Sequence, residues 1–178
     1  VYTIDMSRRT TAANAALAGW GNTRRILLGD TLYESFAAEE IETILAHELG
    51  HHLHGDIWWG MGVQAVLILA GLFFAHRVLA WTAQRMGYLG LGDVAAFPLL
   101  ALAAILFGLI TLPVGNAHSR RCERLADLFA LVTTGNPQAL GSAMLKLAHQ
   151  NLAEVEPERW VVWLLHSHPP IGERVAMA

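Results

Sequence analysis

The stretch His47-Glu48-Leu49-Gly50-His51 decides the interpretation of this chain. On a helix, residues four apart lie on one face, so both imidazoles can bind one metal ion, and zinc is the ion that this pattern predicts. Glu48 would then stand beside the ion without binding it, where it can take a proton from a water molecule attacking a peptide carbonyl. The stretch predicts a zinc hydrolase. The alternative interpretation is a histidine-rich helix end in solvent.

The residues around this stretch have the pattern of an amphipathic helix over 39–55. Apolar side chains recur there at helical spacing, and Glu39 and Glu40 would occupy the first turn, where the helix dipole favours acids. Residues 1–33 predict strands instead, because the runs 14–18 and 24–28 flank a turn signal at residues 19–22. We therefore expect a small N-terminal hairpin followed by the helix that carries the metal ligands.

A catalytic zinc ion needs a third protein ligand and one open position. Glu123 and Asp127 lie four residues apart on a helix expected over residues 119–133, so their carboxylates would face the same way. One could bind zinc while the other orients a ligand imidazole. We favour Glu123 as the ligand. The alternative is an ordinary surface pairing of these acids with Arg120 and Arg124.

Two long apolar runs, residues 57–79 and 94–114, separate the two parts of this site. Each has about the 20 residues needed to cross a hydrocarbon core of about 30 Å. Trp58, Trp59 and Trp81 lie near the ends of the first run, where aromatic belts occur in membrane proteins. We expect a transmembrane hairpin. The alternative is a pair of helices buried in a soluble core or by a partner subunit.

The composition agrees with a membrane protein and argues against nucleic-acid binding. The apolar fraction is 54% and the charged fraction 15%, against about 25% charged residues in ordinary soluble domains. The net charge of −3 provides no basic face for nucleic acid. A single cysteine, Cys122, excludes an internal disulfide.

The sequence resembles the integral-membrane zinc endopeptidases that include the CAAX prenyl proteases and the HtpX-type heat-shock proteases, and it is closer to the first branch. The resemblance extends along nearly the whole chain. The residues that carry it are 1–5, 14, 15, 19, 25–32, 46–52, 116, 119, 120, 123–127, 168–171 and 174. A full CAAX protease has further membrane helices ahead of this region, so the resemblance does not by itself imply prenylated substrates.

The resemblance implies a role for each matching residue of the metal centre. His47, His51 and Glu123 match the family's zinc ligands, and one Zn²⁺ per chain is expected. Glu48 matches its general base. Asp127 matches the acid that supports a zinc-binding histidine.

Further positions match residues near the family's substrate. Asn116 matches an asparagine near the site, expected to support it from outside the ligand shell. His168 and Arg174 match a C-terminal pair thought to approach the substrate carbonyl or the oxyanion, where donors lower the barrier. In this class of protease an edge strand pairs with extended substrate, and residues 14–18, beginning Asn14-Ala15, are the candidate.

The expected fold is mainly α with a small N-terminal β-sheet, a zincin-like (gluzincin) catalytic domain interrupted by a two-helix transmembrane hairpin. Residues 1–56 and 116–178 would form its two halves and residues 57–115 the hairpin. The expected partners are a polypeptide substrate, membrane-anchored or free, and the lipid bilayer. Arginines at 120, 121 and 124 favour a cytoplasmic catalytic side. The alternative function is a zinc-binding membrane scaffold or chaperone-type protein without proteolysis.

Overall fold

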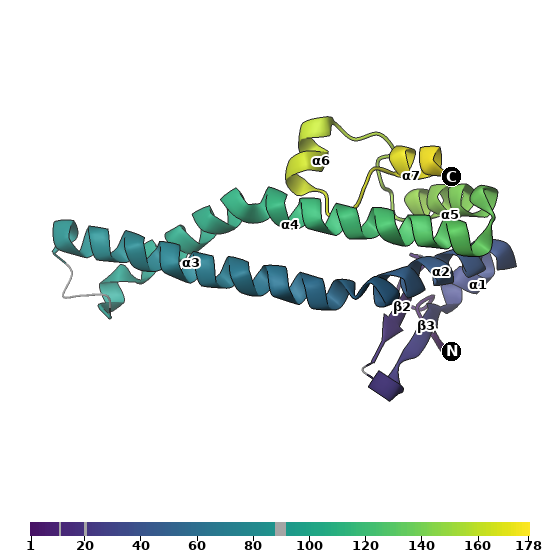
Figure 1. Ribbon diagram of the computed structural model, residues 1–178, viewed down its shortest axis with the longest axis horizontal. Helices are drawn as coiled ribbons and strands as arrows, with labels where there is room; N and C mark the ends of the chain where they lie inside the picture. The colour runs from purple at the N-terminus through teal and green to yellow at the C-terminus, as the bar shows by residue number, and fades with distance from the viewer. Residues whose placement is uncertain (11, 20, 88–91) are drawn as a thin grey trace.

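The computed structural model describes residues 1–10, 12–19, 21–87 and 92–178. Two long helices extend to one side of a smaller body that holds the sheet and most of the other helices (Figure 1). The elements of the described residues are, in order, β1 (Tyr2–Ile4), β2 (Ala15–Ala18), η1 (Gly21–Thr23), β3 (Arg25–Gly29), α1 (Asp30–Ser35), α2 (Ala38–His54), α3 (Asp56–Met86), η2 (Val94–Ala96), α4 (Phe97–Thr134), α5 (Pro137–Gln150), α6 (Arg159–Leu165) and α7 (Ile171–Met177).

The sheet has three strands in the order β1-β3-β2. The predicted hairpin is confirmed, because β2 and β3 are antiparallel, from Ala15 opposite Leu28 to Ala18 opposite Arg25. One residue of the predicted turn, Trp20, lies outside the described residues. β1 pairs with β3 in parallel, which the sequence pattern did not predict. Strand β2 therefore forms one edge of the sheet.

The prediction of strands throughout residues 1–33 was wrong at its end, where α1 begins at Asp30. The carboxylate of Asp30 accepts hydrogen bonds from the backbone N–H groups of Thr31, Met6 and Ser7, at 2.9, 2.8 and 3.0 Å. An acid in the first turn stabilises a helix start, and here it also fastens the segment after β1. A hydrogen bond from the Ser7 side chain contributes most to lowering the pKa of Asp30 to about 2. Burial raises this pKa, and the three backbone hydrogen bonds lower it further.

Helix α2 begins and ends close to the predicted bounds, and α3 follows it almost at once. Gly55, at φ 69°, closes α2 by donating its N–H to the carbonyls of His51 and His52. Glycine adopts this left-handed conformation without the steric penalty of a side chain. Asp56 is already the first residue of α3. A single residue therefore separates the helix of the metal motif from the first apolar helix.

Helix α4 is one helix of 38 residues where the sequence predicted two, over 94–114 and 119–133. That prediction was wrong because residues 115–118 form an ordinary helical stretch. Pro113 is tolerated inside the helix, which ends only at Gly135, at φ 60°. The predicted boundary between residues 115 and 116 thus falls within α4. The helix of the predicted third ligand is therefore a direct continuation of the second apolar helix.

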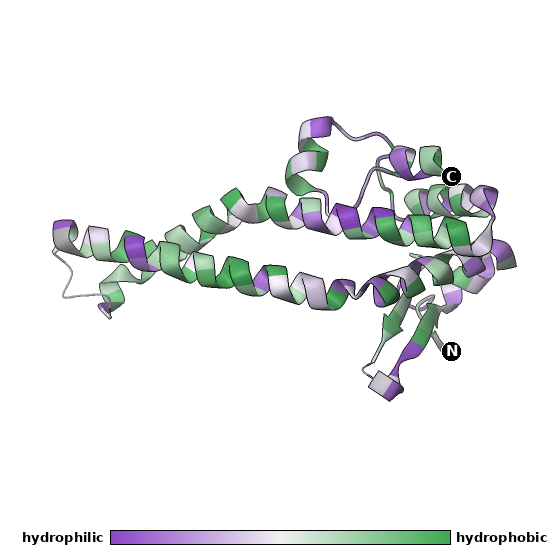
Figure 2. Ribbon diagram, in the orientation of Figure 1, coloured by the Kyte–Doolittle hydropathy of each residue, from purple (hydrophilic) through white to green (hydrophobic). Residues whose placement is uncertain are grey.

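Helices α3 and α4 pack along each other, and both are long and apolar enough to cross a membrane. Only 11% of the residues in the most apolar window of each helix are buried within the protein. Figure 2 shows these apolar residues along the extended half of the molecule. A core helix of a soluble protein would be mostly covered, so this pair presents its apolar surface outward.

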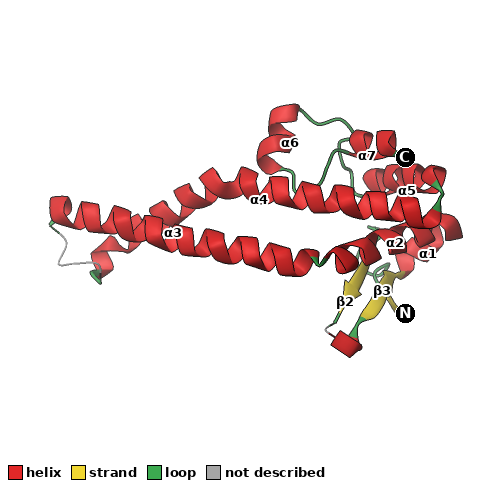
Figure 3. Ribbon diagram, in the orientation of Figure 1, coloured by secondary structure: helices red, strands yellow, loops and turns green. Residues whose placement is uncertain are grey.

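The compact end of the molecule contains the sheet, α1, α2, α5, α7 and the last turns of α4 (Figure 3). One core cluster joins the sheet to α1, α2 and α5 through Leu28, Leu32, Phe36 and Ile44 with Ala13 and Ala143. Glu40 of α2 accepts hydrogen bonds from Ser142 and Lys146 of α5, both at 2.6 Å. It also accepts the N–H of Ala37, which closes the first turn of α2. These contacts hold α2 firmly against α5.

Candidate metal centre

Helices α2 and α4 approach closely at Gly50, and this approach creates the site. A Cβ atom at Gly50 would lie 3.1 Å from Cα of Ala126 and 3.3 Å from the Phe129 side chain. Gly50 lies between the two motif histidines, and Ala126 lies between Glu123 and Asp127. Because residue 50 has no side chain, α2 and α4 can approach closely enough to bring the two acids near the two imidazoles.

The three predicted ligands converge on one point. The Nε2 atoms of His47 and His51 lie 3.1 Å apart. The carboxylate oxygens of Glu123 lie 3.5 Å from the Nε2 of His47 and 3.4 Å from that of His51. Tetrahedral zinc with bonds of about 2.0–2.2 Å spaces its ligand atoms by about 3.3–3.6 Å. Both distances to Glu123 lie in this range and the distance between the two nitrogens is about 0.2 Å shorter, so the three residues could hold a metal ion of this kind.

Each histidine has a carboxylate behind it. The Nδ1 atom of His47 lies 2.8 Å from Oδ1 of Asp127, and Nδ1 of His51 lies 2.7 Å from Oδ2 of Asp56. Such carboxylates fix the orientation of a ligand imidazole and increase its basicity. Sequence reasoning identified Asp127 and missed Asp56. The available signal was an acid directly after the glycine that ends the motif helix.

The electrostatics of the site favour positive charge. Burial lowers the pKa of His47, but hydrogen bonds to the carboxylates of Asp127 and Glu123 outweigh it and raise the pKa to about 9. The pKa of His51 is raised chiefly by its hydrogen bond to Glu123, with a further contribution from Asp56. The same carboxylates that stabilise imidazolium would attract a divalent cation.

Glu48 lies at the edge of this cluster and is half-buried. It lines a cavity of about 310 Å³ together with His47, His51 and Glu123. Burial raises the pKa of Glu48, against the lowering effect of the two imidazoles. Glu48 thus lines the same cavity as the three predicted ligands, where a proton acceptor for an attacking water molecule would have to lie.

The two C-terminal residues lie near Glu123 but in different surroundings. Nε2 of the exposed His168 is 3.3 Å from Oε1 of Glu123, at the rim of the cavity. Arg174 is buried, and its guanidinium forms a bidentate pair with Asp127 at 2.6 and 2.7 Å. It lies 3.7 Å from Glu123. Arg174 is therefore engaged behind His47, while His168 faces the open side.

The remaining predicted residues lie farther from the three ligands. Asn116 is buried and donates its side-chain N–H to the carbonyl of Leu164, at 2.7 Å, so it fastens α6 to α4. Ala15 begins the edge strand β2, and the carbonyl of Asn14 accepts the N–H of Gly29 at 2.9 Å. Leu17 of β2 lines cavities that also contain Glu48. The edge strand thus runs beside the motif helix.

Larger cavities adjoin the metal cavity on both sides. One of about 610 Å³ shares His168 and Arg174 with it and extends toward α5 and α6. Another of about 500 Å³ shares Glu48 and His51 and extends toward the β2–β3 turn and the start of α3. The cluster of ligands therefore lies between two hollows, an arrangement that can hold an extended chain on each side of it.

Comparison with known proteins identifies relatives along the whole chain. The chain is 34% identical over 182 residues to the uncharacterized metalloprotease YhfN of Bacillus subtilis. This match covers 100% of the chain and 43% of YhfN. It is 30% identical over 185 residues to a CAAX prenyl protease 1 homolog of Oryza sativa, covering 99% of the chain and 42% of the homolog. Protease HtpX of Pseudomonas entomophila is 28% identical to the chain over 179 residues, a match that covers 92% of the chain and 60% of HtpX. The chain thus spans less than two thirds of each of these relatives.

The fold is also similar to a solved structure. The crystal structure of S. mikatae Ste24p matches with a TM-score of 0.80 and 24% sequence identity, over 98% of this chain and 43% of that one. The model of peptidase family M48 matches residues 1–178. Because this match covers the entire chain, and because its relatives are those that the motif residues predicted, the chain belongs to peptidase family M48.

Proposed function

We propose that this chain acts as a membrane-associated zinc-dependent endopeptidase that hydrolyses peptide bonds with metal-activated water. The convergence of two imidazole nitrogens and one carboxylate on a point beside Glu48 carries this proposal. Membership of a peptidase family supports a metallopeptidase. In the gluzincin arrangement that we propose, residues 1–56 and 116–178 form one catalytic unit into which the hairpin of residues 57–115 is inserted.

His47, His51 and Glu123 would hold the zinc ion. The ion, when bound, would polarise the scissile carbonyl and make an attacking water molecule more acidic. Glu48 accepts the proton of that water and returns it to the leaving amine. Asp127 and Asp56 keep the two imidazoles oriented, and no covalent intermediate with the protein is needed.

The two C-terminal residues have separate roles in this proposal. His168 can donate to the oxygen on which negative charge develops, because its exposed imidazole faces the open side of the cavity. Arg174 holds Asp127 through its bidentate pair, and so acts on His47 from behind. The expectation that both residues approach the substrate carbonyl is thus kept for His168 alone.

The substrate that we propose is an extended polypeptide lying along β2. This strand is at the edge of the sheet and can add a further strand through main-chain hydrogen bonds. Asn14 and Ala15, at its start, are the candidate contacts. The hollows on either side of the metal cavity would take the side chains that flank the scissile bond.

We place α3 and the first part of α4 in the lipid bilayer, because both are apolar and uncovered. Of the 12 lysines and arginines, only Arg77 and Arg85 belong to the end of the hairpin far from the metal centre. This asymmetry favours a cytoplasmic catalytic side. In sealed inverted membrane vesicles, an added protease should then digest residues 116–178, and their protection would contradict this orientation.

The test compares wild type with Glu48→Gln and Glu42→Gln, purified in detergent with zinc. Glu42 is an exposed acid on the same helix and provides the matched control. Wild type and Glu42→Gln should cleave an unstructured protein, while Glu48→Gln keeps its zinc and loses cleavage by about 10²- to 10⁴-fold. Equal cleavage by all three would exclude Glu48 as the base. Zinc binding without cleavage in wild type would favour a zinc-binding membrane scaffold.

A further inference from the structure

Helix α6 presents two large aromatic side chains to the outside. Trp160 and Trp163 are 64% and 61% exposed, and no residue of this seven-residue helix is buried. Their spacing of three residues places them on the same side of the helix. Leu165, at its end, is also exposed. Tryptophan is highly buried on average in soluble proteins, so two uncovered indoles on one short helix need a partner.

Buried polar groups of α4 hold α6 in place. Asn116 donates to the carbonyl of Leu164, and Arg120 donates to the carbonyls of Val162 and His166, at 2.9 and 2.5 Å. Asn116 and Arg120 are both buried. Two of these carbonyls, those of Leu164 and His166, lie at the helix end beyond the last intrahelical acceptor, and the Val162 carbonyl also accepts the N–H of His166. These hydrogen bonds fix the orientation of α6, so its two tryptophans are exposed on an ordered helix.

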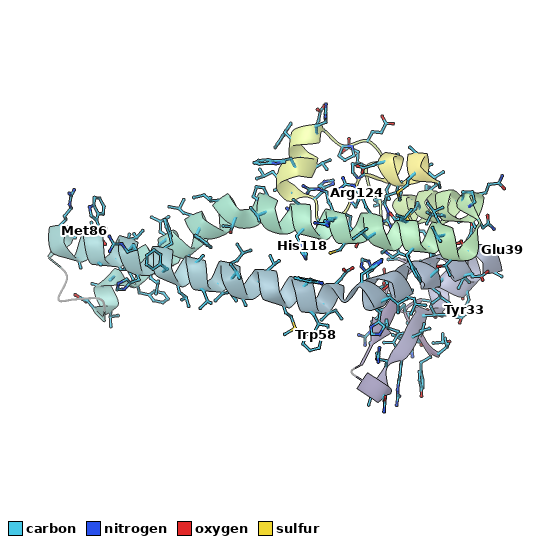
Figure 4. All side chains as sticks on the ribbon, in the orientation of Figure 1. Tyr33, Glu39, Trp58, Met86, His118 and Arg124 are labelled. Carbon is cyan, nitrogen blue, oxygen red and sulfur yellow. The ribbon has the colours of Figure 1, made fainter. Side chains whose placement is uncertain are left out.

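The point of attachment lies at the end of the apolar run of α4. Asn116 follows Val114, the last residue of that run, by two residues, or about 3 Å along the helix axis. Figure 1 shows α6 beside this middle part of α4. On α3, Trp58 and Trp59 are 59% and 68% exposed at the start of the other apolar run. Figure 4 places Trp58 at nearly the same level along the molecule as His118 of α4.

We propose that α6 lies in the headgroup region of the bilayer, with Trp160 and Trp163 in contact with lipid. This inference rests on the proposed function in one respect, the membrane location of α3 and α4. Indoles are favoured at this boundary, because the ring is apolar and the N–H can bond to water or headgroups. Exposed Arg159 precedes them, where its charge can reach lipid phosphate. Together with Trp58 and Trp59, they form an aromatic belt contributed by two separate helices.

This contact would set the height of the metal centre above the membrane. Glu123 lies seven residues beyond Asn116 on the same helix, or about 10 Å along its axis. Lipid contact at α6, beside α4, and at the start of α3 would also restrict the tilt of α3 and α4 relative to the membrane. The cavities around Glu48 would then open close to the lipid surface, where a membrane-anchored polypeptide is concentrated.

The experiment measures which tryptophans touch lipid in the whole chain. One variant keeps Trp163 alone, with the other tryptophans changed to phenylalanine, and a second keeps Trp81, near the far end of α3. A third carries Val132→Trp in a background without native tryptophan. Val132 is exposed on α4, about 27 Å beyond the end of its apolar run. Each is reconstituted in phosphatidylcholine vesicles with and without lipids brominated near the headgroup, and zinc content verifies the fold.

We expect bromine to quench Trp163 as strongly as Trp81 and to leave the tryptophan at residue 132 unaffected. Quenching of Trp81 without quenching of Trp163 would overturn the proposal, since α6 would then be covered by protein or water, while the membrane hairpin would stand. Loss of quenching at both sites would show that the hairpin itself is not inserted, and the membrane part of the proposed function would fail too. Equal quenching at all three sites would also overturn the proposal, because α6 would not be distinguished from the rest of the surface.

Discussion

The close contact at Gly50 makes a quantitative prediction about the metal centre. In Gly50→Ala the new Cβ would meet Cα of Ala126 at 3.1 Å. Carbon atoms prefer separations of about 3.5–4.0 Å, so α4 must move by about 0.4–0.9 Å. Metal–ligand distances tolerate about 0.2 Å. The change therefore displaces Glu123 relative to the two histidines by more than the site accepts.

Two opposing effects make the cost in stability small. Alanine in a helix interior is favoured over glycine by about 1 kcal/mol. Overpacking between the helices costs about 1–3 kcal/mol. We expect the metal-free protein to lose at most about 2 kcal/mol of unfolding free energy by this balance. The zinc affinity should fall by about 10- to 100-fold, the range found when the contacts that support ligands are changed. Gly50 would thus matter more for the metal than for the fold.

The assay determines zinc affinity by competition with a coloured chelator, and stability by thermal unfolding with the metal removed. Gly115→Ala is the matched control, because a Cβ at this helical glycine of α4 meets nothing within 4 Å. It should keep its zinc affinity and gain up to about 1 kcal/mol. Wild-type zinc affinity in Gly50→Ala would refute the reasoning, since the site would then not depend on the distance between α2 and α4.

Other residues give further predictions. Asp56→Asn should weaken zinc binding by about 10- to 100-fold in calorimetric titration, because His51 loses its carboxylate, and an unchanged affinity would remove Asp56 from the site. Arg174→Gln should lower the unfolding free energy by about 1.5–3 kcal/mol, because the buried Asp127 would lose its bidentate partner and keep only Nδ1 of His47. Arg174→Lys should recover only part of the lost unfolding free energy in chemical denaturation. A wild-type unfolding free energy for Arg174→Gln would show that the pair of Arg174 with Asp127 does not stabilise the fold. Burial raises the pKa of Glu40, but its hydrogen bonds outweigh this and hold the pKa below the ordinary value of 4.5. Its contribution to stability is therefore complete above about pH 4.5 and lost as pH falls through the lower folded pKa, so Glu40→Gln and wild type should converge in acid unfolding experiments.

The grouping of the metal site could be predicted because its signals are local. Helical spacing alone puts His47 beside His51 and Glu123 beside Asp127, whatever the rest of the fold. Asp56 was missed because its approach to His51 depends on the left-handed conformation of Gly55, which no periodicity reveals. A periodic pattern therefore predicts which residues share a helix face, but the contact of Asp56 with His51 requires the coordinates.

Long-range contacts were the larger limit. Arg174 and Asp127 are 47 residues apart, and only the packing of α7 on the compact end brings them together. The family resemblance directed attention to Arg174, but its burial reveals that its guanidinium is already engaged. Similarly, β1 pairs in parallel with β3 across 25 residues, a choice that the alternation of side chains in β1 does not specify.

The continuity of the helices means that the hairpin and the metal centre are not independent. Glu123 lies 16 residues beyond Phe107, which packs closely against Gly71 of α3, a separation of about 24 Å along α4. A tilt of α4 by about 1° about that contact would move Glu123 by about 0.4 Å, twice the tolerance of metal–ligand distances. On the other side, Asp56 joins the first turn of α3 directly to His51. The packing of the two apolar helices therefore contributes to the position of the proposed ligands, so that whatever surrounds the hairpin also acts on the geometry of the candidate metal centre.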